Sequence, residues 1–217
     1  MSQAKPTIAS RFRGFLPVIV DVETAGFNAA TDALLEMAMV TINMDDNGKL
    51  YADERVACHV EPFEGASLDP KALAFNGIDP ENPLRGALPE REALQLCFQP
   101  VRHAVKKNGC NRAILVGHNA PFDLGFINAA VDRCSYKRNP FHPFSTLDTV
   151  SLAALAVGHT VLAVSAQLSG MEWSNSEAHS AIYDADQTAE LFCRIVNRWD
   201  EQVDEKPWLP QAMEEAG

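Results

Sequence analysis

Residues 17–24 read Pro-Val-Ile-Val-Asp-Val-Glu-Thr, and this stretch decides the fold. An apolar run rich in β-branched residues predicts a central strand over residues 17–23, buried on both faces. Side chains two positions apart on a strand point the same way, so Asp21 and Glu23 project together from its end. The sequence therefore predicts a pair of neighbouring carboxylates at the end of a core strand.

Two interpretations of Asp21 and Glu23 stand side by side at this point. Neighbouring carboxylates repel each other and lose hydration, and a hard divalent cation with oxygen ligands would offset that cost. Alternatively, the strand simply ends here and both acids face water. The remaining acidic motifs decide between these two interpretations.

The rest of the pattern surrounds this strand with two further strands and then with alternating helices and strands. The predicted elements are strands at 34–44 and 55–61 joined by a turn at 45–48, a mostly irregular segment at 64–88, a helix at 90–107, a buried strand at 113–116, and helices at 148–157, 161–168 and 178–199. This order predicts an α/β fold, a mixed sheet with helices packed on it. The 217 residues, 47% of them hydrophobic, suit one domain over 1–217, with tails 1–10 and 201–217 expected to be flexible.

A second acidic motif, His-Asn-Ala-Pro-Phe-Asp at residues 118–123, directly follows the predicted strand 113–116. Pro121 suits the first turn of a helix, and Asp123 falls in the same turn. Active sites of open α/β sheets gather at the carboxyl ends of strands, which favours a role for Asp123 beside Asp21. The alternative is that Asp123 serves only the dipole and free N–H groups of its own helix.

A third motif, His-Ser-Ala-Ile-Tyr-Asp at residues 179–184, opens the last long helix. His179 at the helix entry and Asp184 one turn later can face the same cleft, whereas Asp186 falls on a different face and is excluded. An imidazole exchanges its proton near neutral pH, so His179 is the candidate general base. The alternative for His179 is a helix-start residue bonded to nearby backbone.

Together these motifs supply four carboxylates and one histidine, a set that suits two-metal phosphodiester hydrolysis. The predicted metal ligands are Asp21, Glu23, Asp123 and Asp184. Two ions would lie roughly 3.5–4 Å apart in such a site. The hard oxygen ligands favour Mg²⁺, and Mn²⁺ is a plausible substitute.

The charge distribution bears on the class of substrate. A net charge of −11 should repel polyanions on average. Residues 100–171, however, carry seven Lys or Arg against three acids, whereas the residues from 172 onward carry eleven acids against three bases. A basic middle region could bind phosphates, so the composition permits a nucleic-acid enzyme without proposing one.

The cysteines and the hydropathy pattern indicate a reducing compartment. The five cysteines are scattered and contain no Cys-x-x-Cys pair, which argues against a disulfide framework and a structural zinc site. No stretch matches the roughly 18 to 20 continuous apolar residues of a membrane span, and no secretory signal is visible. The expected location is the cytoplasm, with no membrane partner.

The three acidic motifs, in the order Asp-x-Glu, Asn-x-x-Phe-Asp and His-x-x-x-x-Asp, resemble those of the DEDDh exonuclease group of the ribonuclease H-like superfamily. The resemblance extends from about residue 11 to residue 199, and the run at 137–144 is specific to one branch of the group. It is carried further by the segments 11–15, 21–28, 77–80, 109–114, 137–144 and 196–199. It implies a ribonuclease H-like, mixed five-stranded sheet flanked by helices, and a metal-dependent 3′→5′ exoribonuclease that releases nucleoside 5′-monophosphates.

The resemblance also implies substrates and partners. It implies trimming of single-stranded 3′ ends of structured RNAs, in tRNA end turnover and in maturation of rRNA and other stable RNAs, with activity on single-stranded DNA as well. It implies a homodimer in which the basic patch of one subunit guides substrate into the other's active site. The matching patch residues are Arg11, Arg13, Lys106, Arg112 and Lys137.

Four phenylalanines match positions at which the family stacks terminal bases: Phe27, Phe75, Phe122 and Phe144. Aromatic faces hold any base at about 1–3 kcal/mol each, which gives affinity without a sequence requirement. Core packing is the alternative, and it is favoured for Phe122. Lys71 departs from the pattern, because some members carry a glutamate there, so no preference for particular 3′ bases is implied.

Three other functions compete with this interpretation. Two of them share the chemistry: a proofreading-type exonuclease on single-stranded DNA, and an oligoribonuclease that degrades very short RNAs. The run at 137–144 and the basic patch argue against both. The third is a non-catalytic RNA-binding module, and the five intact catalytic positions argue against it.

Overall fold

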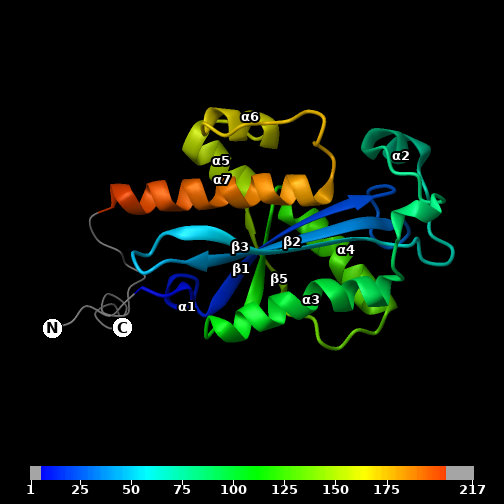
Figure 1. The fold of residues 1–217 in the computed structure, drawn as a ribbon, viewed down its shortest axis with the longest axis horizontal. Coiled ribbons are helices and arrows are strands. Elements are labelled where there is room, and N and C mark those ends of the chain that lie inside the picture. The colour runs from blue at the N-terminus through cyan, green and yellow to red at the C-terminus, as the bar shows by residue number, and fades with distance from the viewer. Residues whose placement is uncertain (1–5, 204–217) are drawn as a thin grey trace.

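A computed structural model describes residues 6–203 and contains a five-stranded mixed sheet at its centre (Figure 1). The strand order is β3-β2-β1-β4-β5. β1 is antiparallel to β2, β2 is antiparallel to β3, and β4 is parallel to both β1 and β5. The bounds are β1 Phe15–Thr24, β2 Leu34–Met44, β3 Leu50–His59, β4 Arg112–Gly117 and β5 Phe141–Asp148. The predicted α/β class and the mixed five-stranded sheet are confirmed.

Helices cover both faces of the sheet (Figure 1). On one face, α7 (Ala181–Gln202) packs on the strands, and α5 (Thr149–Val157) and α6 (Leu162–Leu168) pack on α7. On the other face lie α3 (Glu90–Lys107) and α4 (Ala120–Arg133). The short helices are α1 (Ile8–Arg11), α2 (Pro70–Asn76) and the 3₁₀ turn η1 (Pro83–Arg85).

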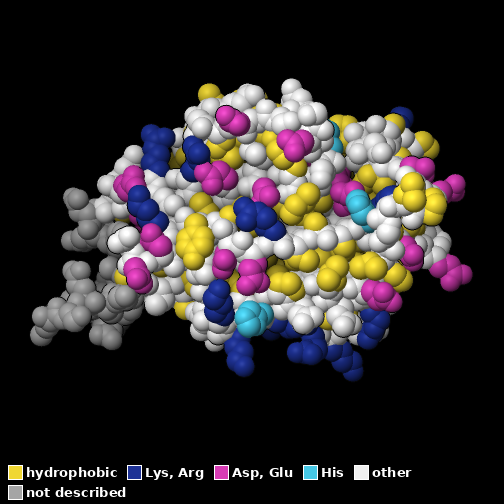
Figure 2. All heavy atoms as spheres, in the orientation of Figure 1, with side chains coloured by type: hydrophobic (Ala, Val, Ile, Leu, Met, Phe, Trp, Pro, Cys, Tyr) yellow, Lys and Arg dark blue, Asp and Glu magenta, His cyan; other side chains and the backbone are white. Residues whose placement is uncertain are grey.

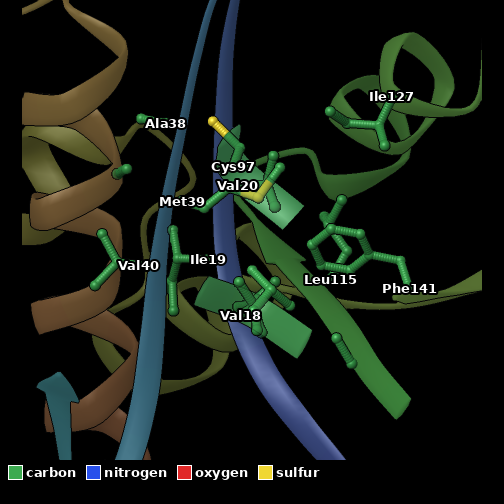
Figure 3. Packing of buried hydrophobic residues seen from close by; sticks show 14 of the residues in the cluster. Val18, Ile19, Val20, Ala38, Met39, Val40, Cys97, Leu115, Ile127 and Phe141 are labelled. Carbon is green, nitrogen blue, oxygen red and sulfur yellow. The ribbon is translucent and has the colours of Figure 1, made fainter. Parts of the chain in front are cut away.

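β1 is the centre of the core, as its apolar run predicts. Val18, Ile19 and Val20 are all buried, because α3 and α4 cover one face of the strand and α7 covers the other. Figure 3 shows these three side chains among buried residues of β2, α3 and β4. This packing holds the polar end of β1 in a fixed position.

Two elements that carry exposed aromatic residues are absent from the sequence prediction. The sequence does not predict β5, because Phe-His-Pro-Phe-Ser-Thr-Leu-Asp has no regular alternation of apolar residues. β5 is an edge strand, a position that tolerates Pro143, and its register with β4 is interrupted. α2 lies within the segment predicted to be mostly irregular. Its signals are capping residues, Asp69 at the N-cap and Gly77 in the left-handed region at the C-cap, and they are too short-ranged to give an apolar period.

Three predicted boundaries also change. β3 begins at Leu50 rather than residue 55, because Asp45 closes a tight turn by accepting the Asn47 and Lys49 N–H groups on its side chain. At the amino end, α1 and its Thr7–Ser10 capping box lie inside the stretch 1–10 that was expected to be flexible. In the expected tail at 201–217, α7 continues to Gln202, and residues 204–217 lie outside the described part of the chain.

The segment Thr149–Leu168 is long and apolar enough to cross a membrane by length and composition alone. In the structure it forms two helices, α5 and α6, separated at Gly158, whose φ is 74°. Leu155, Val161 and Leu168 are exposed on this pair of helices. The segment is therefore an apolar surface of the molecule rather than one continuous helix.

Candidate active site

The carboxyl ends of β1 and β4 and the start of α7 meet at one end of the sheet. Asp21 and Glu23 lie near the end of β1, Asp123 lies in the first turn of α4 after β4, and Asp184 lies in the first turn of α7. The Val22 N–H donates to Asp123 Oδ1 over 3.1 Å, which joins β1 to α4. Possible ligand atoms of Glu23, His179 and Asp184 lie within 4.8 Å of one another. The five predicted residues therefore converge.

The sequence around β4 allows Asp123 to approach closely. A Cβ at position 117 would lie 3.0 Å from both Asp123 Oδ2 and the Ala120 Cα, so the glycine leaves room for the carboxylate and the helix start. Asn119 precedes the helix in the left-handed region, with φ 76°. Asp123 is buried, and its burial follows from this tight turn between β4 and α4.

The start of α7 is shaped by a second left-handed residue. His179 has φ 67°, and its backbone N–H donates to Asp184 Oδ2 over 3.2 Å. The other carboxylate oxygen, Asp184 Oδ1, is buried and has no hydrogen-bond partner among residues 6–203. A buried acceptor without a donor indicates that a cation belongs beside it.

The electrostatics of the cluster agree with that indication. Burial, followed by the charges of Asp123, Asp184, Glu23 and Glu36, raises the pKa of Asp21 well above its ordinary value. Burial and the neighbouring acids raise the pKa of Glu23 to about 8. Burial is likewise the largest cause of the raised pKa values of Asp123 and Asp184. A cation that neutralises this repulsion would restore the ionised forms.

The donor set fits a hard divalent ion. The four carboxylates offer only oxygen atoms, and no thiol lies in the cluster. Asp186 forms an ion pair of 2.5 Å between its Oδ1 and Arg55 Nε on β3, and it does not belong to the group of possible metal ligands formed by Glu23, His179 and Asp184.

Three of the four predicted aromatic residues lie around this cluster. Phe75, on α2, is 70% exposed and its ring centroid lies 4.4 Å from that of His179. Phe27 is 89% exposed, and its ring centroid lies 6.2 Å from that of Phe122. Phe122 also packs on the buried Phe126. Phe122 is thus half-buried, part core and part rim, in agreement with the preference for core packing.

Phe144 lies apart, on the edge strand β5. It is 78% exposed, and its ring contacts His142 at 4.5 Å between centroids. His142 in turn contacts Phe15 at the start of β1. Phe144 is therefore linked to the amino end of β1 rather than to the acidic cluster.

The basic residues also divide. Arg13 is exposed and its guanidinium lies 5.2 Å from the Phe15 ring centroid, and Phe15 is the register partner of Arg112. These cations lie at the amino ends of β1 and β4, opposite the acids. Arg11 is placed differently from the other predicted patch residues: its side chain is only 10% exposed and forms a 2.7 Å ion pair with Asp200. Its part in phosphate binding stays a prediction.

Lys137 borders a cavity of about 750 Å³ between α3 and the loop before β5. Among the described residues no acid lines this cavity, and Figure 2 shows Lys and Arg side chains along the lower edge of the molecule, where α3 lies. Its lining also includes Arg91, Arg102, His103 and Arg138, of which Arg91 lies outside the predicted basic region. Arg102 and Arg138 fall within the basic region 100–171, so composition was the available signal.

Glu36 is a further acid of the site, and no sequence pattern predicts it. Glu36 on β2 is the register partner of Glu23, and its charge raises the pKa values of Asp21 and Glu23. A single glutamate in a predicted strand resembles any solvent-facing residue. Only the pairing of β1 with β2 identifies its position.

Comparison with known proteins agrees with this geometry. The exonuclease family model matches residues 18–192. Ribonuclease T of Hahella chejuensis is 62% identical over 200 residues, which is 92% of each chain, and ribonuclease T of Pectobacterium atrosepticum is 61% identical over 88% of this chain and 86% of that one. E. coli exonuclease I in complex with a dT13 oligonucleotide matches with a TM-score of 0.63 and 20% identity, over 87% of this chain and 42% of the longer one.

The fold and the acidic cluster define a metal-dependent exonuclease, a hydrolase of phosphodiester bonds. Within that class, the chain belongs to the ribonuclease T family. The similarity to exonuclease I supports the fold alone, at 20% identity.

Proposed function

We propose that this enzyme is a 3′→5′ exoribonuclease that trims the single-stranded 3′ ends of structured RNAs, such as tRNA and rRNA precursors. The observation that carries the proposal is the convergence of four carboxylates and His179 from three separate segments. The two relatives named ribonuclease T support RNA as the substrate.

The residues Asp21, Glu23, Asp123 and Asp184 would hold two Mg²⁺ ions, with Mn²⁺ as a substitute. The carboxylate oxygens of these four residues and the buried Asp184 Oδ1, which has no hydrogen-bond partner among residues 6–203, support this assignment. When bound, the ions lower the pKa of the attacking water and stabilise the charge on the leaving 3′-oxygen.

His179 acts as the general base in this proposal. It lies beside Glu23 and Asp184 and is exposed to the mouth of the site, so it can take a proton from the attacking water. The water oxygen bonds to phosphorus, the bond from phosphorus to the 3′-oxygen breaks, and that oxygen takes a proton. The products are a nucleoside 5′-monophosphate and an RNA shortened by one nucleotide.

The aromatic residues would bind the last bases of the RNA. Phe75 lies next to His179, and Phe27 is almost fully exposed beside Phe122. A Cβ at position 26 would lie 2.1 Å from Asp32 Oδ2, so Gly26 allows the tight loop that exposes Phe27. Phe144 belongs to the proposed base-binding set on its exposure and on the family resemblance.

The proposed phosphate track consists of Arg13, Lys106, Arg112 and Lys137, all exposed. Asp21 lies six residues beyond Phe15, about 20 Å along an extended strand, so Arg13 and Arg112 of one chain lie far from its own acids. A homodimer in which the track of one subunit serves the partner's site would remove this separation. The apolar surface of α5 and α6, with Leu155 79% exposed, supports a partner surface there.

End-labelled tRNA tests the reaction. With Mg²⁺ we expect shortening from the 3′ end, nucleotide by nucleotide, and none after chelation. Parallel reactions on single-stranded DNA and on dinucleotides distinguish the DNA exonuclease and the oligoribonuclease. A faster rate on either of them would move the assignment to that substrate.

Mixing a variant with an inactive site and a variant with weakened RNA binding tests the homodimer. At RNA concentrations below KM, random pairing of equal amounts of Asp123→Asn and Arg13→Ala/Arg112→Ala gives heterodimers in which one intact site faces one intact track, so these heterodimers should contribute about a quarter of the wild-type rate if the track acts on the partner's site. No recovery in a sample proven to exchange subunits would contradict action between subunits. A cytoplasmic location completes the proposal.

A further inference from the structure

Glu36 lies where two strands and a helix of the site meet. It pairs with Glu23 on one side and with His59 on the other, so these three side chains share one face of β1, β2 and β3. The Glu36 side chain is only 16% exposed. A carboxylate buried to this degree next to an acidic cluster needs a structural or chemical reason.

The contacts of Glu36 give that reason. One oxygen lies 2.9 Å from His59 Nδ1, and the other accepts a hydrogen bond from the Ala181 N–H over 3.4 Å. Ala181 is the first residue of α7, and the side chain of its N-cap, Ser180, makes no capping hydrogen bond. The acceptor at this helix start therefore comes from the sheet, where a negative charge also favours the helix dipole.

The turn held by Glu36 is the turn that carries the chemistry. The Asp184 N–H donates to the Ser180 carbonyl over 3.0 Å, and the His179 N–H donates to the Asp184 carboxylate. The positions of His179 and Asp184 are thus coupled through the backbone next to Ala181. A displacement of this helix start would move a proposed base and a proposed metal ligand together.

Apolar packing and this hydrogen bond both act on the helix start. Ala181 is buried in the apolar core, at 1% exposed. Glu36 borders two cavities, one of about 530 Å³ that includes His179 and one of about 240 Å³ that includes His59 and Ser180. With open space on both sides, a shorter side chain would leave the Ala181 N–H without an acceptor from β2, so the hydrogen bond from Glu36 adds to the packing that anchors this turn.

We propose that Glu36, supported by His59, is a positioning residue that holds the start of α7 and so sets the geometry of His179 and Asp184. This inference rests on the proposed function for its kinetic effect. The expected loss follows from the effect of removing groups that orient metal ligands, about 10- to 100-fold in activity or metal affinity.

The kinetic test compares Glu36→Ala with Glu36→Gln. We expect kcat to fall about 10- to 100-fold in Glu36→Ala with KM for RNA nearly unchanged, because the bases and phosphates bind elsewhere. Glu36→Gln should recover most of the rate, since its side-chain carbonyl can still accept from Ala181. Asp186→Asn is the matched control: it removes a nearby acid that pairs with Arg55, and it should keep the wild-type kcat.

Two measurements without substrate separate this inference from the proposed function. In metal-free protein, Glu36→Ala should speed hydrogen exchange of the Ala181 amide, whereas Glu36→Gln should not. By calorimetry, Glu36→Ala should bind Mn²⁺ about 10-fold more weakly. Unchanged exchange and unchanged Mn²⁺ affinity would overturn the positioning role even if wild-type protein cleaved no RNA. A kcat in Glu36→Ala equal to wild type, or a loss that Glu36→Gln does not recover, would overturn it as well.

Discussion

The two ends of β1 differ in charge, burial and local backbone. At the carboxyl end, Asp21 and Glu23 meet Asp123 and Asp184 in a cluster whose raised pKa values reflect burial and mutual repulsion. At the amino end, Arg13 is exposed on the ring of Phe15, next to Arg112. One strand therefore separates a partly buried cluster of acids from an exposed group of cations.

This difference explains how a protein with net charge −11 can act on a polyanion. The acids are concentrated where metal ions would neutralise them, and the cations lie where phosphates can reach them. The net charge of the protein therefore does not decide whether it binds a polyanion. The positions of the acidic and basic side chains decide it. The predictions below test whether the two ends have these separate roles.

The largest effect is expected at the acidic end. Asp123→Asn should reduce cleavage by more than the about 10²- to 10⁴-fold that general acid–base catalysis contributes, because a metal ligand is lost. The fold should survive, as the side chain keeps its size and its contact with the Val22 N–H. Single-turnover cleavage with circular dichroism checks both expectations, and full activity would falsify the metal role.

His179→Ala should have the next largest effect. We expect a fall of about 10²- to 10⁴-fold in kcat, the range of general-base catalysis, while Mn²⁺ still binds to the four carboxylates. Calorimetric titration beside the kinetics separates the two roles. A wild-type rate would remove His179 from the mechanism, and lost Mn²⁺ binding would make it a ligand instead.

At the cationic end, Arg13→Ala/Arg112→Ala should weaken binding without changing kcat. Each lost phosphate contact should reduce the slope of log affinity against log salt by about 0.7 for a single strand. Lys49→Ala is a suitable control, because Lys49 is an exposed cation that pairs with Glu201 on α7. An unchanged salt slope in the double variant would count against the phosphate track.

The smallest effect concerns the stability of metal-free protein. The folded-state pKa of Glu23, about 8, exceeds its ordinary value of 4.5. The contribution of Glu23 to the free energy of unfolding is therefore fully present below about pH 4.5 and is lost as the pH rises through 8. Asp21→Asn relieves part of this repulsion. It should therefore raise the Tm at pH 8 by about 2–4 °C for each kcal/mol relieved, and the gain should shrink toward pH 5.

Thermal scans across this pH range check the prediction, with Asp186→Asn as the control outside the cluster. Mg²⁺ should stabilise the wild type by mass action and stabilise Asp21→Asn much less. A metal-free wild type that becomes more stable as pH rises from 5 to 8 would contradict the raised pKa values.

The sequence predicted the acidic end better than the cationic end, for a physical reason. Asp21, Glu23, Asp123 and Asp184 are tied to short local patterns, a strand end and two helix starts, and local patterns are visible along the chain. The ion pair of Arg11 could not be predicted, because its partner, Asp200, is 189 residues away and only the folded chain brings them together. Glu36 was missed for the same reason, since only the register between β1 and β2 identifies it.

The same distinction applies to the fold. The helix at 90–107 was predicted with the bounds that α3 has, because it has a long period and clear ends. β5 depends on pairing with β4 along the sheet edge, and its own residues carry little β signal. Elements that are stabilised mainly by tertiary contacts are the ones that a sequence pattern misses.

The left-handed backbone of His179 means that catalysis and folding make opposing demands on one residue. A non-glycine residue in this region is strained by roughly 1–3 kcal/mol, although histidine is found there more often than most other side chains. Glycine would relieve the strain but could not move a proton. In thermal melts, His179→Gly should therefore have a higher Tm than His179→Ala. The difference would measure the stability lost because a side chain is present at this left-handed position.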